Sequence, residues 1–181
     1  MEIVDLRSDT VTRPTPEMRS AMADAEVGDD AYGEDPTVIE LQDEYADRVG
    51  KEAALYVPSG TMANQLALRV HGTVGGSVIA GRRQHVVAHE AGAAGANTQT
   101  QFHIVDDEGG TISPDDVTWA RKAAEYHWPT PSLVCIENTH MPASGAPWSL
   151  DELAELRASA DELPIHMDGA RLFNAEVATG I

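Results

Sequence analysis

Basic residues are scarce in this 181-residue sequence. Twelve lysines and arginines stand against 30 acidic residues, which gives a formal net charge of −18, and only Lys51 and Lys122 are lysines. Such a surface repels nucleic acid and anionic membranes, so neither is expected as a partner. A lysine-poor, carboxylate-rich surface also suits a protein that stays soluble in concentrated salt. We therefore state a halophilic source as a hypothesis, with an ordinary acidic protein as the alternative.

Cysteine, long apolar runs and a leader pattern are also missing. Cys135 is the single cysteine, which excludes an intrachain disulfide, and its apolar neighbours predict a core position. No run is long enough to span a bilayer, and residues 1–5 lack the basic and apolar regions of a signal peptide. With 42% apolar residues, we expect one folded, soluble, cytoplasmic domain.

Capping and turn signals divide the chain into alternating short strands and helices. After an extended arm over residues 6–14, the pattern predicts strands at 53–57, 77–80, 101–105, 132–137 and up to 168. It predicts helices at 16–25, 36–49, from 59 onward, 89–95, from 113 onward and 150–160. This alternation indicates an α/β fold whose mainly parallel sheet is covered by helices on both faces.

A strand ending in an acid, Pro164 to Asp168, is followed by a glycine and a helical segment. Ligands of α/β proteins bind where strands end, so Asp168 is a candidate ligand group. Aspartate is also a good N-cap, so Asp168 has a second interpretation as the cap of the next helix. The motif alone leaves both open.

The Ser59-Gly60-Thr61 step turns an apolar run into a helix, and its backbone amides predict an anion site. The sequence lacks a nucleophile elbow, a Gly-Lys-Ser/Thr phosphate loop and zinc-ligand spacing, so no metal is expected. An anion site and a strand-end carboxylate at one sheet edge suit pyridoxal phosphate, with Asp168 at the pyridine nitrogen. His85 or His127 could cover the ring, although either could be an ordinary histidine.

Five motifs together resemble the low-specificity threonine aldolases, β-eliminating lyases among the fold-type I pyridoxal phosphate enzymes. The resemblance is colinear from Asp5 to the last residue and lies in Asp5 to Pro14, Val27 to Val38, Pro58 to Asn64, Glu137 to His140 and His166 to Asn174. It implies the fold-type I large domain and retro-aldol cleavage of threonine or allo-threonine to glycine and acetaldehyde.

The resemblance also implies roles for individual residues. Ser59, Gly60 and Thr61 hold the cofactor phosphate, His85 stacks on the ring and Asp168 pairs with the pyridine nitrogen. Ser8 and Arg171 bind the substrate carboxylate, His127 lies near the β-hydroxyl, and Glu90 stands behind His85 in the proton network. A homodimer or homotetramer is implied as well, with Tyr32 as a candidate contact between subunits.

The chain departs from the family in three places. The family's Schiff-base lysine lies on a later strand, and neither Lys51 nor Lys122 occupies its place. The family's small C-terminal domain has no counterpart, so residues 1–181 correspond to an N-terminal arm plus a truncated large domain. Met141 to Pro147 replace the family's glycine and asparagine. A non-catalytic remnant or interaction module, and another fold-type I enzyme such as an aromatic amino-acid β-eliminating lyase, therefore remain as alternatives.

Overall fold

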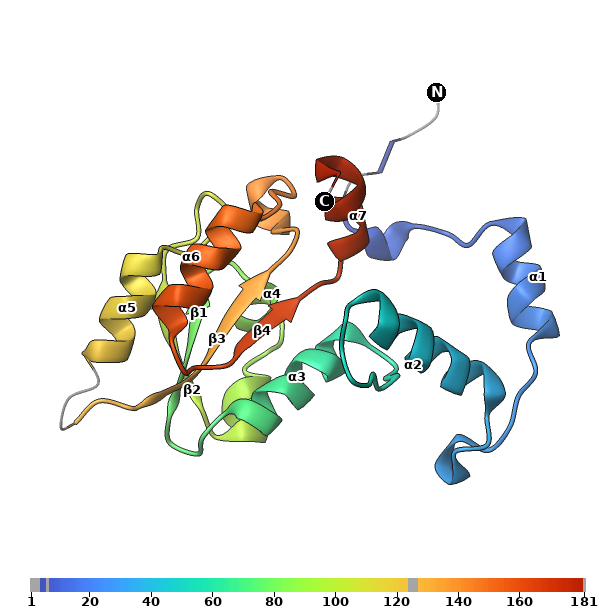
Figure 1. Ribbon diagram of the computed structural model, residues 1–181, viewed down its shortest axis with the longest axis horizontal. Helices are drawn as coiled ribbons and strands as arrows, with labels where there is room; N and C mark the ends of the chain where they lie inside the picture. The colour runs from blue at the N-terminus through green and yellow to red at the C-terminus, as the bar shows by residue number, and fades with distance from the viewer. Residues whose placement is uncertain (1–3, 6, 124–126, 181) are drawn as a thin grey trace. The chain divides into compact units, whose positions relative to one another are not determined.

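The computed structural model describes residues 4–5, 7–123 and 127–180 (Figure 1). The chain forms two compact units, Met1–Tyr56 and Val57–Ile181. The first unit holds two helices, and the second holds the sheet with the rest of the helices. The sequence predicts one domain after an extended arm over residues 6–14, whereas the structure divides the chain after Tyr56.

Two capped helices make up the regular part of the first unit. The elements are the 3₁₀ turns η1 (Asp9–Val11) and η2 (Asp30–Tyr32) and the helices α1 (Pro16–Asp24) and α2 (Pro36–Arg48). Both helix starts are as predicted, because Thr15 and Asp35 accept the amides of Met18 and Val38. Asp35 also accepts the Gly28 amide at 3.1 Å, and these backbone donors lower the pKa of its carboxyl.

The predicted strand at Ala53 to Val57 is wrong. These residues form no regular secondary structure, and the side chain of Leu55 is 73% exposed. The Tyr56 amide donates to the side-chain oxygen of Gln42 at 2.9 Å instead of to a neighbouring strand. The apolar run therefore serves as the connection between α2 and the second unit.

The second unit is built on four parallel strands: β1 (Ser77–Gly81), β2 (Gln101–Val105), β3 (Pro131–Glu137) and β4 (Ile165–Asp168). They lie in the order β2-β1-β3-β4 (Figure 1). Glu137 pairs with Asp168 at the ends of their strands. The predicted parallel sheet is confirmed, with each of these four strands within one residue of its expected position.

Helices cover both faces of this sheet, as predicted. Alternate strand residues separate two buried clusters: Ile79, Val134 and Ile136 face one side, and Val78, Leu133 and Cys135 face the other. The first side packs against α5 (Pro114–Lys122) and α6 (Leu150–Ala160), which lie next to each other in Figure 1. The second side packs against α3 (Gly60–His71), α4 (His85–Ala88) and the π-helical turn η3 (Ala94–Thr98).

The helix predicted at His89 to Gly95 is wrong in position. The short helix α4 starts at His85 and ends at Ala88, and η3 begins only at Ala94. Between them, Ala91 and Gly92 have φ angles of 51° and 76°, which a right-handed helix cannot contain. This early helix is what places His85 at the end of the sheet.

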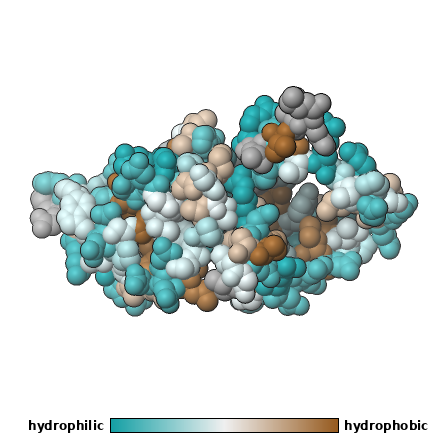
Figure 2. Space-filling view, turned by 90° about the horizontal axis from the view of Figure 1, so that it is seen from above, coloured by the Kyte–Doolittle hydropathy of each residue, from teal (hydrophilic) through white to brown (hydrophobic). Residues whose placement is uncertain are grey.

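The face of the molecule that Figure 2 shows is mainly polar. Hydrophilic and intermediate colours cover most of the visible face in Figure 2, as the net charge of −18 leads one to expect. Among the described residues, no helix combines the length and apolar character needed to cross a bilayer.

Candidate active site

The site lies at the carboxyl edge of the second unit's sheet, where β3 and β4 end in Glu137 and Asp168. Helix α3 runs antiparallel to these strands, because the residue after its C-terminal cap, Thr73, donates from its amide to Ser132 at the amino end of β3. The N-terminus of α3 therefore points toward the edge that holds both acids. Parallel α/β sheets commonly bind ligands at this edge.

The start of α3 offers amide donors for an anion. The Ser59 hydroxyl accepts the Met62 amide at 3.1 Å, and the Ser59 carbonyl accepts the Ala63 amide at 3.1 Å. Within the described part of the chain, the amides of Gly60 and Thr61 have no acceptor. A Cβ added to Gly60 would meet no atom within 4 Å, so the space before the helix is open. Free amides and the helix dipole together favour a phosphate there.

Asp168 is held by two donors and does not cap the following helix. Its Oδ2 accepts the Asn64 side-chain amide at 2.8 Å, and its Oδ1 accepts the Ala170 amide at 3.1 Å. Helix α7 (Leu172–Thr179) has Arg171 as its N-cap, without a side-chain cap bond. The structure therefore does not support the interpretation of Asp168 as a helix cap. Its carboxylate lies at the sheet edge, where it is half-buried and can serve as a ligand group.

Five side chains, which we call the Asn64 cluster, form one hydrogen-bonded group: Asn64, His85, Glu90, His166 and Asp168. The Asn64 nitrogen donates to Glu90 Oε1 and to Asp168 Oδ2, each at 2.8 Å. His166 Nε2 lies 2.8 Å from the Asn64 oxygen, and burial lowers the pKa of His166. His85 Nδ1 lies 2.9 Å from Glu90 Oε1.

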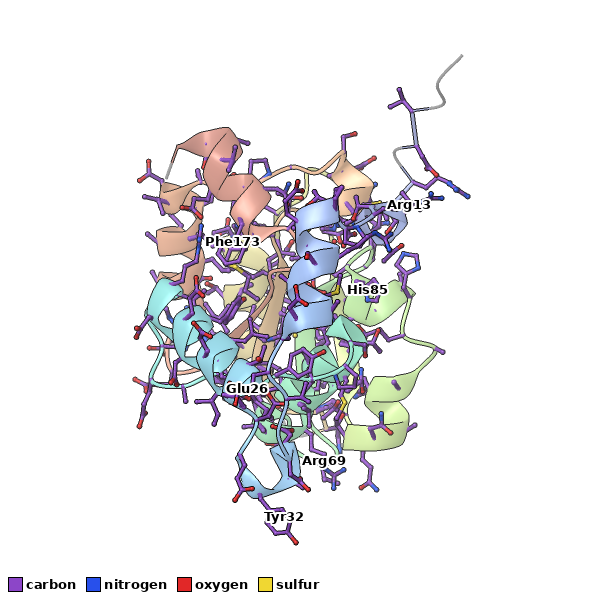
Figure 3. All side chains as sticks on the ribbon, turned by 90° about the vertical axis from the view of Figure 1, so that its right-hand side faces the viewer. Arg13, Glu26, Tyr32, Arg69, His85 and Phe173 are labelled. Atoms are coloured by element: carbon purple, nitrogen blue, oxygen red, sulfur yellow. The ribbon has the colours of Figure 1, made fainter. Side chains whose placement is uncertain are left out.

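His85 forms the open side of the cluster and projects from α4 (Figure 3). Its side chain is 43% exposed, whereas that of Glu90 is 1% exposed. In the neutral imidazole, a proton on Nδ1 that is donated to the Glu90 carboxylate leaves the lone pair on Nε2. The His85 amide also donates to Glu137 Oε2 at 2.8 Å, and Gln65 donates to Glu90 Oε2 at 2.6 Å. Glu137 thus holds the backbone of His85, and Glu90 holds its ring.

A second polar group, which we call the Asp107 cluster, is sealed beside the ends of β1 and β2: Gly81, Arg83, Asp107 and His140. Asp107 Oδ2 accepts the Arg83 amide and lies 2.9 Å from His140 Nε2. The side chains of His140 and Asp107 are 0% and 1% exposed. A Cβ on Gly81 would lie 2.4 Å from Asp107 Oδ2, so only glycine fits beside this carboxylate.

The remaining predicted residues lie outside the two clusters. Ser8 belongs to the first unit, where its hydroxyl accepts the Thr10 amide at 3.3 Å. His127 is exposed and precedes β3, at the opposite end of that strand from Glu137. Lys122, which is the lysine of the second unit, is the last residue of α5 and lies toward the same opposite edge. Arg171 follows Asp168 by three residues and is half-buried.

The sequence analysis missed Asn64 and His166 as site residues. His166 precedes Asp168 by two residues, so both side chains face the same side of β4. Asn64 follows Gly60 by four residues, so both lie on one face of α3. These spacings are signals that single-sequence reasoning could have used. The buried thiol of Cys135 takes no part, because burial raises the pKa of Cys135 far above its usual range.

Comparison with known proteins identifies the family of the chain. The family profile described as beta-eliminating lyase matches residues 5–181. The chain belongs to the beta-eliminating lyase family.

Low-specificity L-threonine aldolase 1 of Arabidopsis thaliana is 43% identical over 189 residues, covering 100% of this chain and 52% of the relative. The low specificity L-threonine aldolase of Escherichia coli K12 is 43% identical over 181 residues, covering 98% and 54%. The chain thus spans about half the length of these relatives.

Solved structures share this fold. The threonine aldolase of Leishmania major superimposes with a TM-score of 0.60 at 30% identity, covering 65% of this chain and 34% of that one. A protein from Exiguobacterium described as a putative aromatic amino acid beta-eliminating lyase/threonine aldolase gives a TM-score of 0.73 at 24% identity, covering 90% and 45%. The second match supports the fold alone. Together with the parallel sheet, these matches confirm the predicted fold-type I architecture.

Proposed function

We propose that the full-length protein is a pyridoxal phosphate-dependent lyase that cleaves threonine or allo-threonine to glycine and acetaldehyde. The hydrogen bond between Asn64 and Asp168 is the observation that carries the proposal. Asn64 lies four residues beyond Gly60, or about 6 Å along the helix axis. The carboxylate of Asp168, which accepts from Asn64, and the open amides at the start of α3 therefore lie on the same edge of the sheet.

The residues at this edge fit the cofactor. Gly60 and Thr61 would bind the phosphate with their amides, while Ser59 supports the turn through its cap. Asp168 would accept from the pyridine nitrogen, and the exposed ring of His85 would lie against the cofactor ring. When bound, pyridoxal phosphate supplies an electron sink for the pair left at Cα as the Cα–Cβ bond breaks.

His85 and Glu90 are suited to handle the proton of the substrate's β-hydroxyl. Glu90 holds the proton on His85 Nδ1, which leaves Nε2 to accept a proton directly or through a water. The carboxylate of Glu90 then balances the charge that the imidazole gains. Retro-aldol cleavage needs this proton removed as the carbonyl of acetaldehyde forms.

Ser8 and Arg171 are proposed to bind the substrate carboxylate, and His127 to lie near the β-hydroxyl. Within one copy, His127 stands at the wrong end of β3 for this role. We therefore propose that His127 acts from a second copy, in a homodimer or homotetramer in which the exposed Tyr32 is a further contact. The mass of the full-length protein in solution tests this, and a monomer at assay concentration contradicts it.

Acetaldehyde release tests the proposed reaction. Full-length protein with pyridoxal phosphate is expected to release acetaldehyde and glycine in equal amounts from L-threonine or L-allo-threonine. Acetaldehyde can be followed through reduction by alcohol dehydrogenase and NADH. A protein that binds the cofactor and releases no acetaldehyde, or that releases pyruvate and ammonia from an aromatic amino acid, would overturn the assignment in favour of another family activity.

A non-catalytic role is the second candidate for the 181-residue chain itself. The observation that favours it is the placement of Lys122 away from the carboxyl edge. We expect borohydride reduction of this chain with pyridoxal phosphate, followed by peptide mass spectrometry, to leave Lys51 and Lys122 unlabelled. Specific labelling of either lysine would contradict that.

We also propose that the protein is adapted to high salt. The net charge of −18 and the two lysines support this proposal. The unfolding midpoint is expected to rise from low to molar salt, and a midpoint that does not rise would remove the proposal. A cytoplasmic location stays a prediction.

A further inference from the structure

A single buried carboxamide connects the two acids of the site. Asn64 is 3% exposed, and its nitrogen donates to Glu90 Oε1 and Asp168 Oδ2 at 2.8 Å each. These acids lie 26 and 104 residues further along the chain. An amide nitrogen has two hydrogens, so both are committed to carboxylates.

The orientation of this carboxamide is fixed by its partners. Carboxylates only accept hydrogen bonds, so the nitrogen must face Glu90 and Asp168 and the oxygen must face His166. His166 Nε2 is therefore the donor in its 2.8 Å contact with the Asn64 oxygen. Three neighbours from two segments, β4 and the turn that follows α4, thus hold Asn64 in one rotamer.

The same bonds connect Asp168 to His85. Glu90 Oε1 accepts from both Asn64 and His85 Nδ1, so it is shared between the two. Asp168, Asn64, Glu90 and His85 form a continuous chain of hydrogen bonds whose two ends are the more exposed members.

We propose that Asn64 is a positioning residue that fixes the Asp168 carboxylate relative to the Glu90–His85 pair. A flat, anionic heteroaromatic cofactor would then meet a carboxylate at its edge and an imidazole at its face in one orientation. This inference rests on the proposed binding of pyridoxal phosphate. It adds that edge and face contacts are coupled through one side chain which itself need not touch the cofactor.

The test uses full-length protein and pyridoxal phosphate itself. Asn64→Asp keeps the shape of the side chain and removes both N–H donors, so three carboxylates face one another. Cofactor affinity is expected to fall at least about tenfold, as for the loss of a hydrogen bond to a charged group. The induced circular dichroism of the bound cofactor, which depends on a single ring orientation, is expected to fall more than its absorbance. Asn174→Asp makes the same change on the exposed surface of α7 and is expected to change neither.

His166 supplies an independent route if Asn64→Asp fails to fold. His166→Leu removes the donor to the Asn64 oxygen and is expected to reduce the induced dichroism, whereas His166→Gln retains a donor and is expected to restore it. Thermal unfolding of each variant separates a misplaced side chain from a lost fold.

A mutant cycle tests the coupling directly. With Asn64 present, the effects of His85→Phe and Asp168→Asn on cofactor affinity are expected to deviate from additivity by about threefold or more. In an Asn64→Ser background, where the shorter hydroxyl side chain cannot bridge the two acids, the same two effects are expected to add.

Additive effects in both backgrounds, or an Asn64→Asp protein with wild-type affinity and dichroism, would overturn the inference and leave the proposed function standing. Wild-type protein that binds no pyridoxal phosphate would instead remove the proposed function.

Discussion

The Asn64 cluster and the Asp107 cluster contain similar side chains but differ in their exposure to solvent. Each joins a buried acid to a histidine at the carboxyl edge of one sheet. In the Asn64 cluster, however, His85 is 43% exposed and Asp168 is half-buried. In the Asp107 cluster, the side chains of Asp107 and His140 are 1% and 0% exposed. The space between Gly81 and Asp107 is too small even for a Cβ atom on Gly81.

This difference in exposure separates the roles of the two clusters. The Asn64 cluster can receive a ligand, whereas the Asp107 cluster connects segments of the fold. The Asp107 carboxylate joins the end of β1, through the Arg83 amide, to the segment after β3, through His140. The Asn64 cluster ends in side chains that solvent reaches. Changes to the Asp107 cluster are therefore expected to alter stability, and changes to the Asn64 cluster to alter cofactor binding.

The largest expected effect is that of Asp107→Ala. It leaves His140 and the Arg83 amide buried without their acceptor, and should lower the free energy of unfolding by about 3–5 kcal/mol. Urea denaturation measures the change. Asp106→Ala, which removes the neighbouring exposed acid paired with Arg82, is the control and should leave the midpoint near that of the wild type. Equal midpoints for the two variants would contradict a structural role for Asp107.

A somewhat smaller loss is expected for Gly81→Ala. Its Cβ would lie 2.4 Å from Asp107 Oδ2 and 2.6 Å from Asp107 Cβ, so the backbone or the carboxylate must shift. Such overpacking costs about 1–3 kcal/mol of stability. Gly109→Ala is the matched control, because a Cβ there meets no atom within 4 Å. A Gly81→Ala protein as stable as the control would show that the cluster is less tightly packed than described.

Asp168→Asn should change the stability of the protein little and its affinity for pyridoxal phosphate strongly. Asparagine can still accept from Asn64, so we expect less than about 1 kcal/mol of lost stability. Affinity of the full-length protein for pyridoxal phosphate should fall about tenfold or more, because a charged acceptor becomes neutral. Absorbance titration gives the affinity and urea denaturation the stability. A stability loss as large as that of Asp107→Ala would erase the distinction between the two clusters.

The smallest expected effect is a dependence on pH through His166. Burial lowers the pKa of His166 in the folded protein, against the opposing charges of Asp168 and Glu90 and with the help of nearby His71. The unfolded chain then binds the proton more readily, so stability is full above the unfolded pKa of about 6.5 and is lost as the pH falls below it. The loss is at most about 1.4 kcal/mol per pH unit for one group.

His166→Gln is the variant that isolates this contribution. Urea denaturation at pH 7.5 and pH 5.5 should show a smaller decrease for the variant than for the wild type. An identical decrease in both proteins would assign the pH dependence to other groups.

Local signals in the sequence predicted most of the fold. Thr15, Asp35, Ser113 and Ser149 each cap a helix as predicted, because a cap is decided by residues within one turn. The strand expected at residues 53–57 failed for the converse reason. Its apolar run fits a strand, but strand formation needs a partner elsewhere in the chain, and the Tyr56 amide bonds a side chain instead.

Only part of the site could be predicted from the sequence. Parallel topology predicts that Asp168 and the start of α3 lie at the same edge of the sheet, and the structure has them there. The connection through Asn64 could not be predicted, because it depends on how α3 is rotated against β4. Asp107 gave no local signal, and His140 stood out only as the last residue of the Glu137 to His140 motif, without a role. Their contact appears only when the segments after β2 and β3 are brought together.

The hydrogen bond from Asn64 to Asp168 also has a consequence for the order of folding. It closes a loop of 104 residues, and the contact between Asn64 and His166 closes one of 102. Contacts between such distant residues form late, because the chain between them must first be ordered. During synthesis, helix α3 leaves the ribosome long before β4, so the edge is completed only when the last strand docks. Cofactor binding would therefore report on finished folding and would not guide its early steps.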